Sequence, residues 1–288
     1  MKRLAPAICL ACLTSQVAQA SPPIVLDNGA IRVIVDPQVF AVTFIGVPGG
    51  SNFLLSQPLT EEEREGGGWV ESGGLHTDLI PYVEGDEALR RGPAVVTLQE
   101  PDRVVMEGPA SDARKVKLTK EAQLYPGQAK ARFRVTAHAA TDEPVVLALR
   151  NTIHLPASCT LRLEKAGGAI KVMSGADNLS PAVVSSMQYW LIPIPPTAEI
   201  NKVVLGTTHA TSEVQNIDGY WTRRLLTEST LEAAGGAEPR LLCLLDDETK
   251  SYVVSLQGPR TRATPEMPAH IEEVWSLKVR GSRVFKGE

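Results

Sequence analysis

The chain has 288 residues, of which 29 are Lys or Arg and 33 are Asp or Glu, giving a net charge of −4. Its basic residues form no run or stripe, which argues against nucleic acid or an anionic membrane surface as partner. No stretch beyond the first twenty residues approaches the apolar length of a membrane-spanning helix, so we expect no membrane insertion. The hydrophobic share of 43% is ordinary and, at this length, sufficient for a sizeable core.

The first twenty residues have the order of a secretory signal peptide. Lys2 and Arg3 precede an apolar run at 4–13, and the Ala-Gln-Ala at 18–20 provides the small residues of a cleavage site before Ser21. We therefore expect residues 1–20 to be removed and the mature protein to be periplasmic or secreted. Loss of Lys2 and Arg3 leaves 27 basic and 33 acidic residues, a net charge of −6.

Cys159 and Cys243 are the cysteines that remain after this cleavage. One disulfide is possible in an oxidising compartment. Each cysteine lies in an apolar, strand-like run, however, where buried thiols are common. We expect both to be free and buried.

Strand signals recur along the whole chain. Asp27-Asn28-Gly29 stands between two β-branched runs, and Asn-Gly accepts the positive φ that a tight hairpin needs. Short apolar runs then follow, separated by turn residues every ten or so positions, which is typical of a large antiparallel sandwich. The expected strands lie in 24–36, 40–47, 94–99, 103–108, 115–125, 129–139, 145–155, 159–165, 169–174, 202–207, 220–226, 240–246, 251–258 and 270–279.

Helix signals are sparse. A capping box at 60–63 is ended by Gly66, and a second short candidate lies at 226–236. No repeat, low-complexity tract or linker divides the chain. We expect one all-β domain at 22–285, an antiparallel two-sheet sandwich with one or two short helices.

The segment at 69–81, WVESGGLHTDLIP, follows three glycines and contains two more at Gly73 and Gly74. We expect a loop at the rim of the sandwich, because glycines permit sharp bends and a buried strand would not tolerate unpaired His76 and Asp78. Contact with a ligand and an Asx-type turn that fixes the loop are both open. No third ligand group is near in sequence, so we expect no metal and no other cofactor.

The order of motifs resembles that of galactose mutarotase-like proteins. The stretch 25–38, VLDNGAIRVIVDPQ, leads through a strand to Gly50, Asn52, Phe53 and Leu54, which match the turn Gly-x-Asn-hydrophobic-Leu. A Trp-bearing glycine-rich loop, the Arg-Asn pair at 150–151 and a final Glu/Trp strand at 270–279 follow in the same order. The resemblance is to an exported, uncharacterised bacterial branch. It implies a β-supersandwich fold and a carbohydrate ligand.

The same resemblance directs attention to acid–base residues. Epimerases of that superfamily carry Asn-His at the end of a central strand, whereas here Thr152 follows Asn151 and His154 lies three residues past Asn151. Opening a sugar ring needs a base for the anomeric hydroxyl and an acid for the ring oxygen. The expected catalytic residues are His76, His154 and Glu273.

Glu273 shares one face of its strand with Trp275 and Leu277, which places it inward. An inward carboxylate is costly unless it is used or paired, and an ion pair with an arginine is the alternative to a ligand role. For His154 the alternative is a hydrogen-bonded structural histidine.

Further polar and aromatic residues fit sugar binding. Aromatic faces stack on pyranose rings, whereas charged and amide groups bind hydroxyls; the alternative for the tryptophans is a place in the core. The expected ligand-binding residues are Asp78, Arg150, Asn151, Trp190, Trp221 and Arg223.

Three functions are consistent with these observations. The first is an exported carbohydrate-binding protein, with a neutral mono- or oligosaccharide favoured because the chain is acidic. The second is an enzyme on the same fold, an aldose epimerase or a polysaccharide-active protein that uses a His/Glu acid–base pair. The third is a non-catalytic structural or assembly protein of the cell envelope. The fold resemblance supports a carbohydrate only by association.

The exported protein is expected to begin at Ser21, because Ala18 and Ala20 are the small residues that a signal peptidase reads. Intact-mass measurement of the exported protein tests this. A mass that corresponds to a lipid-modified Cys12 would contradict it.

Overall fold

The computed structural model describes residues 21–56, 60, 62, 73–86, 89, 92–111, 113–156, 158–164, 171–174, 184–185, 188–192, 202–207, 211–227, 230, 240–246 and 251–278. The predicted signal peptide and most of the two predicted short helices lie outside these residues and stay predictions. Within the described part of the chain, no helix is long and apolar enough to cross a membrane.

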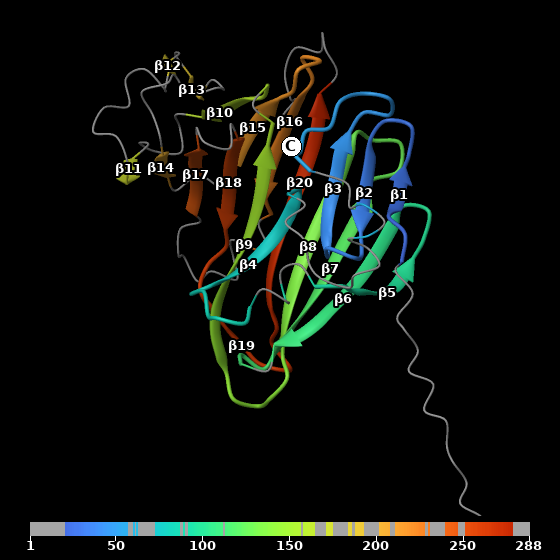
Figure 1. Ribbon diagram of the computed structural model, residues 1–288, viewed down its shortest axis with the longest axis vertical. Helices are drawn as coiled ribbons and strands as arrows, with labels where there is room; N and C mark the ends of the chain where they lie inside the picture. Colours follow the sequence, from blue (N-terminus) through green and yellow to red (C-terminus); the bar gives the residue numbers. More distant parts are fainter. Residues whose placement is uncertain are drawn as a thin grey trace, which may run out of the picture.

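Two antiparallel sheets of ten strands each form the fold (Figure 1). The first sheet has the order β1 (Ile24–Asp27), β2 (Arg32–Asp36), β3 (Ala41–Gly46), β4 (Leu75–Ile80), β9 (Val145–Leu155), β18 (Ser251–Gln257), β17 (Arg240–Asp246), β14 (Lys202–Thr207) and β11 (Lys171–Ser174), with β19 (Thr261–Ala263) also paired to β9. The predicted two-sheet all-β sandwich is confirmed.

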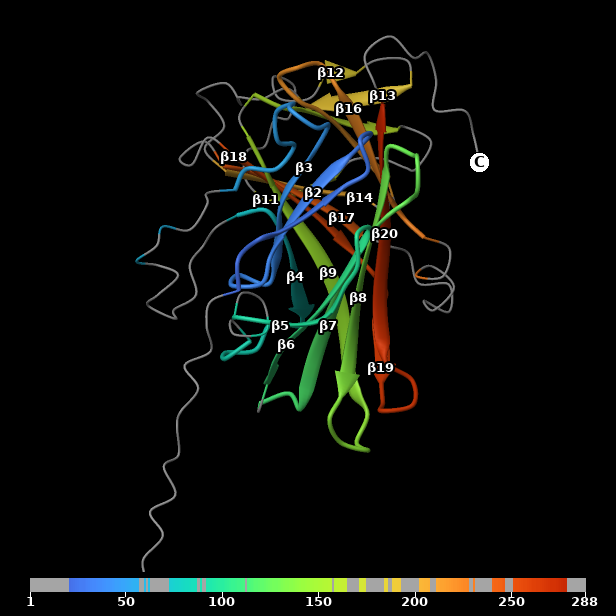
Figure 2. The same cartoon turned by 90° about the vertical axis from the view of Figure 1, so that its right-hand side faces the viewer.

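The second sheet has the order β12 (Val184–Ser185), β13 (Tyr189–Ile192), β10 (Thr160–Glu164), β15 (Thr211–Gln215), β16 (Trp221–Leu226), β20 (Ala269–Lys278), β8 (Lys130–Ala139), β7 (Val116–Leu124), β6 (Arg103–Ser111) and β5 (Val95–Gln99). Its long strands β8 and β20 run beside β9 of the first sheet along the longest axis of the molecule (Figure 2). The two sheets therefore meet most closely around β9.

Each strand-like run of the sequence forms a strand, whereas β4, β12, β13, β15 and β19 were not predicted. Two of these, β12 and β19, have only two and three residues, too few for a visible alternation. The sequence of β15 is TSEVQ, in which polar residues outnumber apolar ones. Periodicity of apolar residues therefore found the strands that alternate and missed the short and polar ones.

The core lies between the sheets and follows the alternation of the strands. In β7, β8 and β20 every second side chain is buried. Phe133 and Trp275 meet edge to face there, with ring centroids 6.0 Å apart and an interplanar angle of 85°. The inward prediction for Glu273, Trp275 and Leu277 is confirmed, since all three are buried.

The turn that carried the family resemblance is held by one side chain. The Asn52 carboxamide oxygen accepts hydrogen bonds from the backbone N–H groups of Ile45 and Leu54, both at 3.0 Å. Its amide nitrogen donates to the carbonyl of Thr43 at 2.7 Å. Asn52 therefore replaces backbone partners at the end of β3, which explains why an asparagine stands at this position.

Cys159 and Cys243 are free thiols with 1% and 0% exposure, as the sequence predicted. Burial raises the pKa of each thiol to about 12. Because the thiolate is the reactive form, both cysteines are chemically inert in the folded protein.

Without residues 1–20, the folded protein should not react with a thiol reagent at pH 8, and the unfolded protein should expose two thiols, those of Cys159 and Cys243. Above pH 9.0, the ordinary pKa, the unfolded chain releases both thiol protons while the folded chain retains them, so the free energy of unfolding falls as pH rises toward about 12. Denaturation at several pH values measures this decline, which should be shallower in the Cys159→Ala/Cys243→Ala variant. Rapid thiol reaction of the native protein would contradict the expectation.

Candidate functional site

The segment predicted as a rim loop is an inner strand of the first sheet. Gly73 and Gly74 have positive φ values of 71° and 80°, and a Cβ at Gly74 would lie 2.4 Å from the carbonyl oxygen of Val42. After this bend β4 pairs with β9 over its whole length. The loop prediction is therefore wrong for 75–80, and residues 69–72 lie outside the described residues.

Strands β4 and β9 present different residues on their two faces. The hydroxyl of Thr77 donates to Asn151 Oδ1 at 2.8 Å, and Asn151 Nδ2 donates to Glu273 Oε1 at 2.9 Å, so these side chains face the second sheet. Neighbouring residues on a strand point to opposite faces. The outer face of β4, β9 and β18 therefore carries His76, Asp78, Arg150, Thr152, His154 and Ser255, which we call the His–Asp cluster.

Asp78 is the centre of the His–Asp cluster. Its Oδ2 atom accepts hydrogen bonds from Arg150 Nη2 and Thr152 Oγ1, both at 3.0 Å. Its Oδ1 atom lies 3.8 Å from His76 Nε2. The pairing explains how a carboxylate with 5% exposure is tolerated in the middle of a sheet.

Two further contacts complete the His–Asp cluster. The rings of His76 and His154 lie with their centroids 5.3 Å apart and are inclined by 37°. The hydroxyl oxygens of Thr152 and Ser255 are 3.0 Å apart, and since Thr152 donates to Asp78, Ser255 donates to Thr152. Imidazoles, hydroxyls, a carboxylate and a guanidinium thus meet on three adjacent strands.

Access to the His–Asp cluster is uneven. His76 is 4% exposed, whereas Arg150 and His154 are only partly buried. A ligand would therefore meet Arg150 and His154 first. Asp78 and Arg150 neutralise each other, so with neutral imidazoles the cluster has no net charge.

Glu273 does not join the His–Asp cluster, which corrects the expected His/Glu acid–base pair. Its carboxylate has 0% exposure and pairs with Arg224, whose Nε atom lies 2.9 Å from Glu273 Oε2. Asn151, predicted to bind ligand, also faces the second sheet and holds Glu273. The alternation of β9 and β20 places both residues between the sheets, so the ion-pair alternative describes Glu273.

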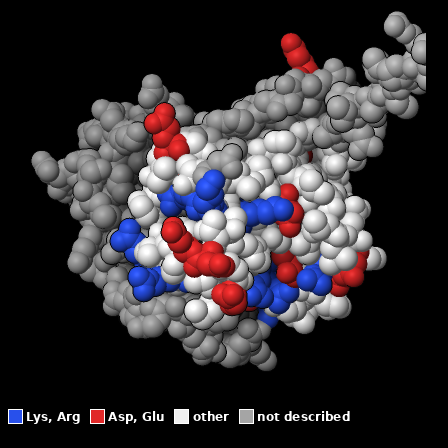
Figure 3. All heavy atoms as spheres, turned by 90° about the horizontal axis from the view of Figure 1, so that it is seen from below, with Lys and Arg blue, Asp and Glu red and all other residues white. Residues whose placement is uncertain are grey.

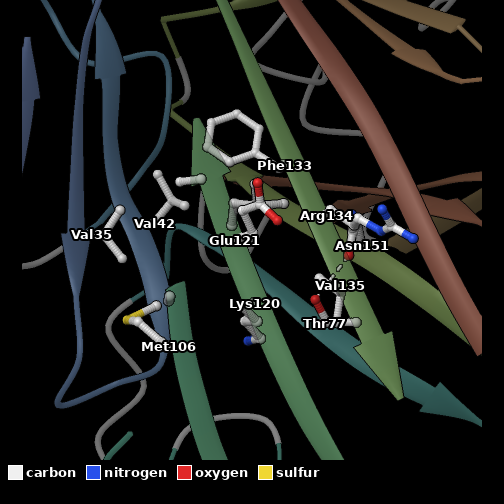
Figure 4. A pocket seen from close by; sticks show the side chains of 13 residues that line it. Val35, Val42, Thr77, Met106, Lys120, Glu121, Phe133, Arg134, Val135 and Asn151 are labelled. Carbon is white, nitrogen blue, oxygen red and sulfur yellow. Dashed lines mark hydrogen bonds between the residues drawn. The ribbon is translucent and has the colours of Figure 1, made fainter. Parts of the chain in front are cut away.

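A cavity between the sheets lies next to these residues. Thr77 and Asn151 point toward one another from β4 and β9 and face β7 and β8 across the cavity (Figure 4). Its volume is about 20 Å³, room for about one water molecule. A sugar cannot enter a space of this size, so this cavity is not the ligand site.

The predicted aromatic binding residues belong to the second sheet. Trp190 is partly buried against the core, which is the alternative to ligand binding that the sequence left open for the tryptophans. Trp221 and Arg223 lie on β16, where they alternate with buried Thr222 and Arg224. The Trp221 ring stacks at 4.1 Å on the Arg162 guanidinium.

The guanidinium of Arg162 also stacks at 4.1 Å on Tyr189 and pairs with buried Glu213. Trp190, Trp221 and Arg223 are therefore not brought together with His76 and His154. The scattering arises because a tryptophan near a turn in the sequence carries no information about which sheet it joins.

Ser255 was missed by the sequence reasoning, and Thr152 was noted only as a departure from the family pattern. Both are buried hydroxyl residues, with 6% and 3% exposure. Ser255 stands in the apolar run YVVSL, and a buried hydroxyl in such a run indicates a partner across the sheet, which was the signal available. Among the residues that the structure describes, no group of three or more His, Cys, Asp or Glu could hold a metal ion.

No family model matches this chain, and no curated protein matches it in sequence. Solved structures do resemble it. A candidate aldose 1-epimerase from Escherichia coli K12 superposes with a TM-score of 0.60 at 10% identity, covering 89% of this chain and 99% of that one. A galactose mutarotase related enzyme from Lactobacillus acidophilus gives 0.55 at 8% identity, covering 91% and 99%.

A galactose mutarotase-like protein from Lactobacillus casei ATCC 334 gives a TM-score of 0.52 at 9% identity, covering 89% of this chain and 100% of that one. These coverages extend over nearly the whole of each partner. The chain therefore has the galactose mutarotase-like fold, and the resemblance noted in the sequence is confirmed at the level of fold.

Asp78→Asn should lower the free energy of unfolding by about 1–3 kcal/mol, because the amide leaves the Arg150 guanidinium without its charged acceptor. Urea denaturation measures the change. Asp142→Asn, at an exposed turn position, is the matched control and should be close to neutral. Equal stability of the two variants would show that the contacts of Asp78 do not stabilise the fold.

Proposed function

We propose that this protein binds a neutral mono- or oligosaccharide at the His–Asp cluster. One observation carries the proposal: His76, His154, Asp78 and Arg150 converge on the outer face of adjacent strands. These groups include donors and acceptors, which is what recognition of several sugar hydroxyls needs. The names of the solved structures with this fold support a carbohydrate by association.

Charge favours a neutral ligand over an acidic one. The guanidinium of Arg150 is already neutralised by Asp78 at 3.0 Å. The end of the molecule seen from below shows Lys and Arg mixed with Asp and Glu (Figure 3). Among the described residues of that face the two signs are interspersed, so these residues create no field of one sign that would attract an anionic polymer.

The second candidate is an enzyme that opens and closes a sugar ring, and the two adjacent imidazoles favour it. In such a reaction one neutral imidazole takes the proton of the anomeric hydroxyl and becomes an imidazolium, while the other, present as an imidazolium, donates a proton to the ring oxygen and becomes neutral. The bond between the anomeric carbon and the ring oxygen then breaks as the carbonyl forms. His76 and His154 replace the His/Glu pair in this role, since Glu273 is buried between the sheets.

Export is part of the same proposal. The charged start, the short apolar run and the Ala-Gln-Ala of residues 1–20 support export, and they favour a binding protein in the periplasm or outside the cell.

His154→Ala and His76→Ala should each weaken sugar binding by about 1–3 kcal/mol, the usual range for a lost hydrogen bond in a desolvated site. Calorimetric titration with a panel of neutral aldoses and oligosaccharides measures this, and polarimetry of a fresh aldose solution measures ring opening. His138→Ala, on the second sheet, is the control and should bind as the parent does.

Two results decide between the candidates. Faster approach to optical equilibrium with the parent, lost in His76→Ala and His154→Ala, supports the enzyme. Binding without such acceleration supports the binding protein. If no sugar of the panel binds the parent at about millimolar concentration, the carbohydrate proposal fails.

A further inference from the structure

One fully buried ion pair lies directly behind the His–Asp cluster. Arg224 of β16 and Glu273 of β20 each have 0% side-chain exposure, and their atoms Nε and Oε2 are 2.9 Å apart. The Arg224 guanidinium also stacks on the Trp275 ring at 5.1 Å. Both residues belong to the second sheet, yet most of their remaining polar contacts reach the first sheet.

These contacts reach β9 and β18 directly, and they reach β4 through the side chain of Asn151. Arg224 Nη2 donates to the carbonyl oxygen of Asn151 on β9 at 3.4 Å, and Arg224 Nη1 donates to that of Val254 on β18 at 3.3 Å. Glu273 Oε1 accepts from Asn151 Nδ2, whose carboxamide oxygen accepts from Thr77 on β4.

Each contacted residue is a direct neighbour of a cluster residue in the chain. Thr77 stands between His76 and Asp78, and Asn151 stands between Arg150 and Thr152. Val254 precedes Ser255. Because neighbours on a strand point to opposite faces, a contact behind the sheet fixes the backbone from which the cluster side chain projects.

We infer that Arg224 and Glu273 are positioning residues for the His–Asp cluster, and this inference rests on the sugar site proposed above. The pair holds β4, β9 and β18 at the depth and register that bring the two imidazoles and Asp78 together. Stability alone does not account for the pair, since apolar side chains of similar volume often stabilise a core at least as well as a buried ion pair. The contacts to backbone carbonyls are what apolar side chains cannot replace.

Four variants separate positioning from stability: Arg224→Met, Glu273→Gln, the double variant that combines them, and Arg224→Lys. Arg224→Met and Glu273→Gln each leave one buried charge without its partner and should destabilise the fold. The double variant carries neither charge and should regain part of the loss, but it still lacks the donors to Asn151 and Val254. Arg224→Lys keeps a positive charge opposite Glu273, but its single ammonium group cannot reach the carbonyls of both Asn151 and Val254. This variant replaces Arg224→Met and Glu273→Gln in the comparison if those variants fail to fold.

The readout is the position of the imidazole signals of His76 and His154 in ¹H–¹³C NMR spectra, which needs no sugar. We expect both to move in Arg224→Lys and in the double variant, while His138 on the second sheet stays in place. Val104→Ala, a core truncation in β6, is the destabilised control and should leave all three unchanged. Sugar affinity should fall by about tenfold in the double variant.

The inference is overturned if the double variant and Arg224→Lys show the signals of His76 and His154 at their parent positions. Movement of these signals in Val104→Ala would overturn it as well, since destabilisation alone would then explain the effect. A parent protein that binds no sugar removes the proposed function, but the NMR comparison still decides whether the pair positions the cluster.

Discussion

Strand β4 and the middle of β9 carry buried side chains on both faces, and the architecture around them depends on this constraint. A strand with one solvated face can leave its polar side chains to water, whereas here each polar side chain has to find its partner inside the protein. Asp78 meets Arg150 and Thr152 on the outer face. Asn151 meets Thr77 and Glu273 on the inner one. The two sets of contacts lie on opposite faces of the same two strands and are made by alternating residues.

This arrangement separates two tasks that the sequence alone could not tell apart. Buried charge behind the sheet is paired within the fold, while the cluster in front retains half-buried groups at Arg150 and His154 that a ligand can reach. An inward carboxylate is therefore no guide to an acid–base residue in this sandwich. Solvent access, rather than burial of charge, distinguishes the candidate site from the core.

The strands and their pairing into a sandwich could be predicted because apolar and polar residues alternate in most of them, as in β7 and β8. The strand β4 could not be predicted in this way, because its sequence LHTDLI has three polar residues in succession and glycines precede it. Its burial depends on partners 70 or more residues away, such as Arg150 and Thr152, 72 and 74 residues distant. Local patterns carry no such information.

Of the candidate site, His76, Asp78, Arg150 and His154 could be named from residue type and motif order, and the structure brings these four together. The role of Ser255 could not be assigned, because the apolar run around it indicates only that it has a partner, and the register of β18 against β9 decides that the partner is Thr152. The alternation of β9 turns Asn151 toward the second sheet, where it contacts Glu273 of β20. A shift of one residue in β9 would exchange its outward and inward side chains, so the site depends on register as much as on residue identity.

The strands of the His–Asp cluster begin at residues 75, 145 and 251, and they are neighbours only in the finished sheet. Pairing of strands so far apart in the sequence requires long loops to close, at a cost in chain entropy, before contacts between the strands can stabilise the fold. Proteins dominated by such pairing fold slowly. The last of the three strands along the chain, β18, ends at Gln257. The cluster therefore cannot assemble during synthesis until β18 has emerged, and a fragment lacking β18 would have no site to present.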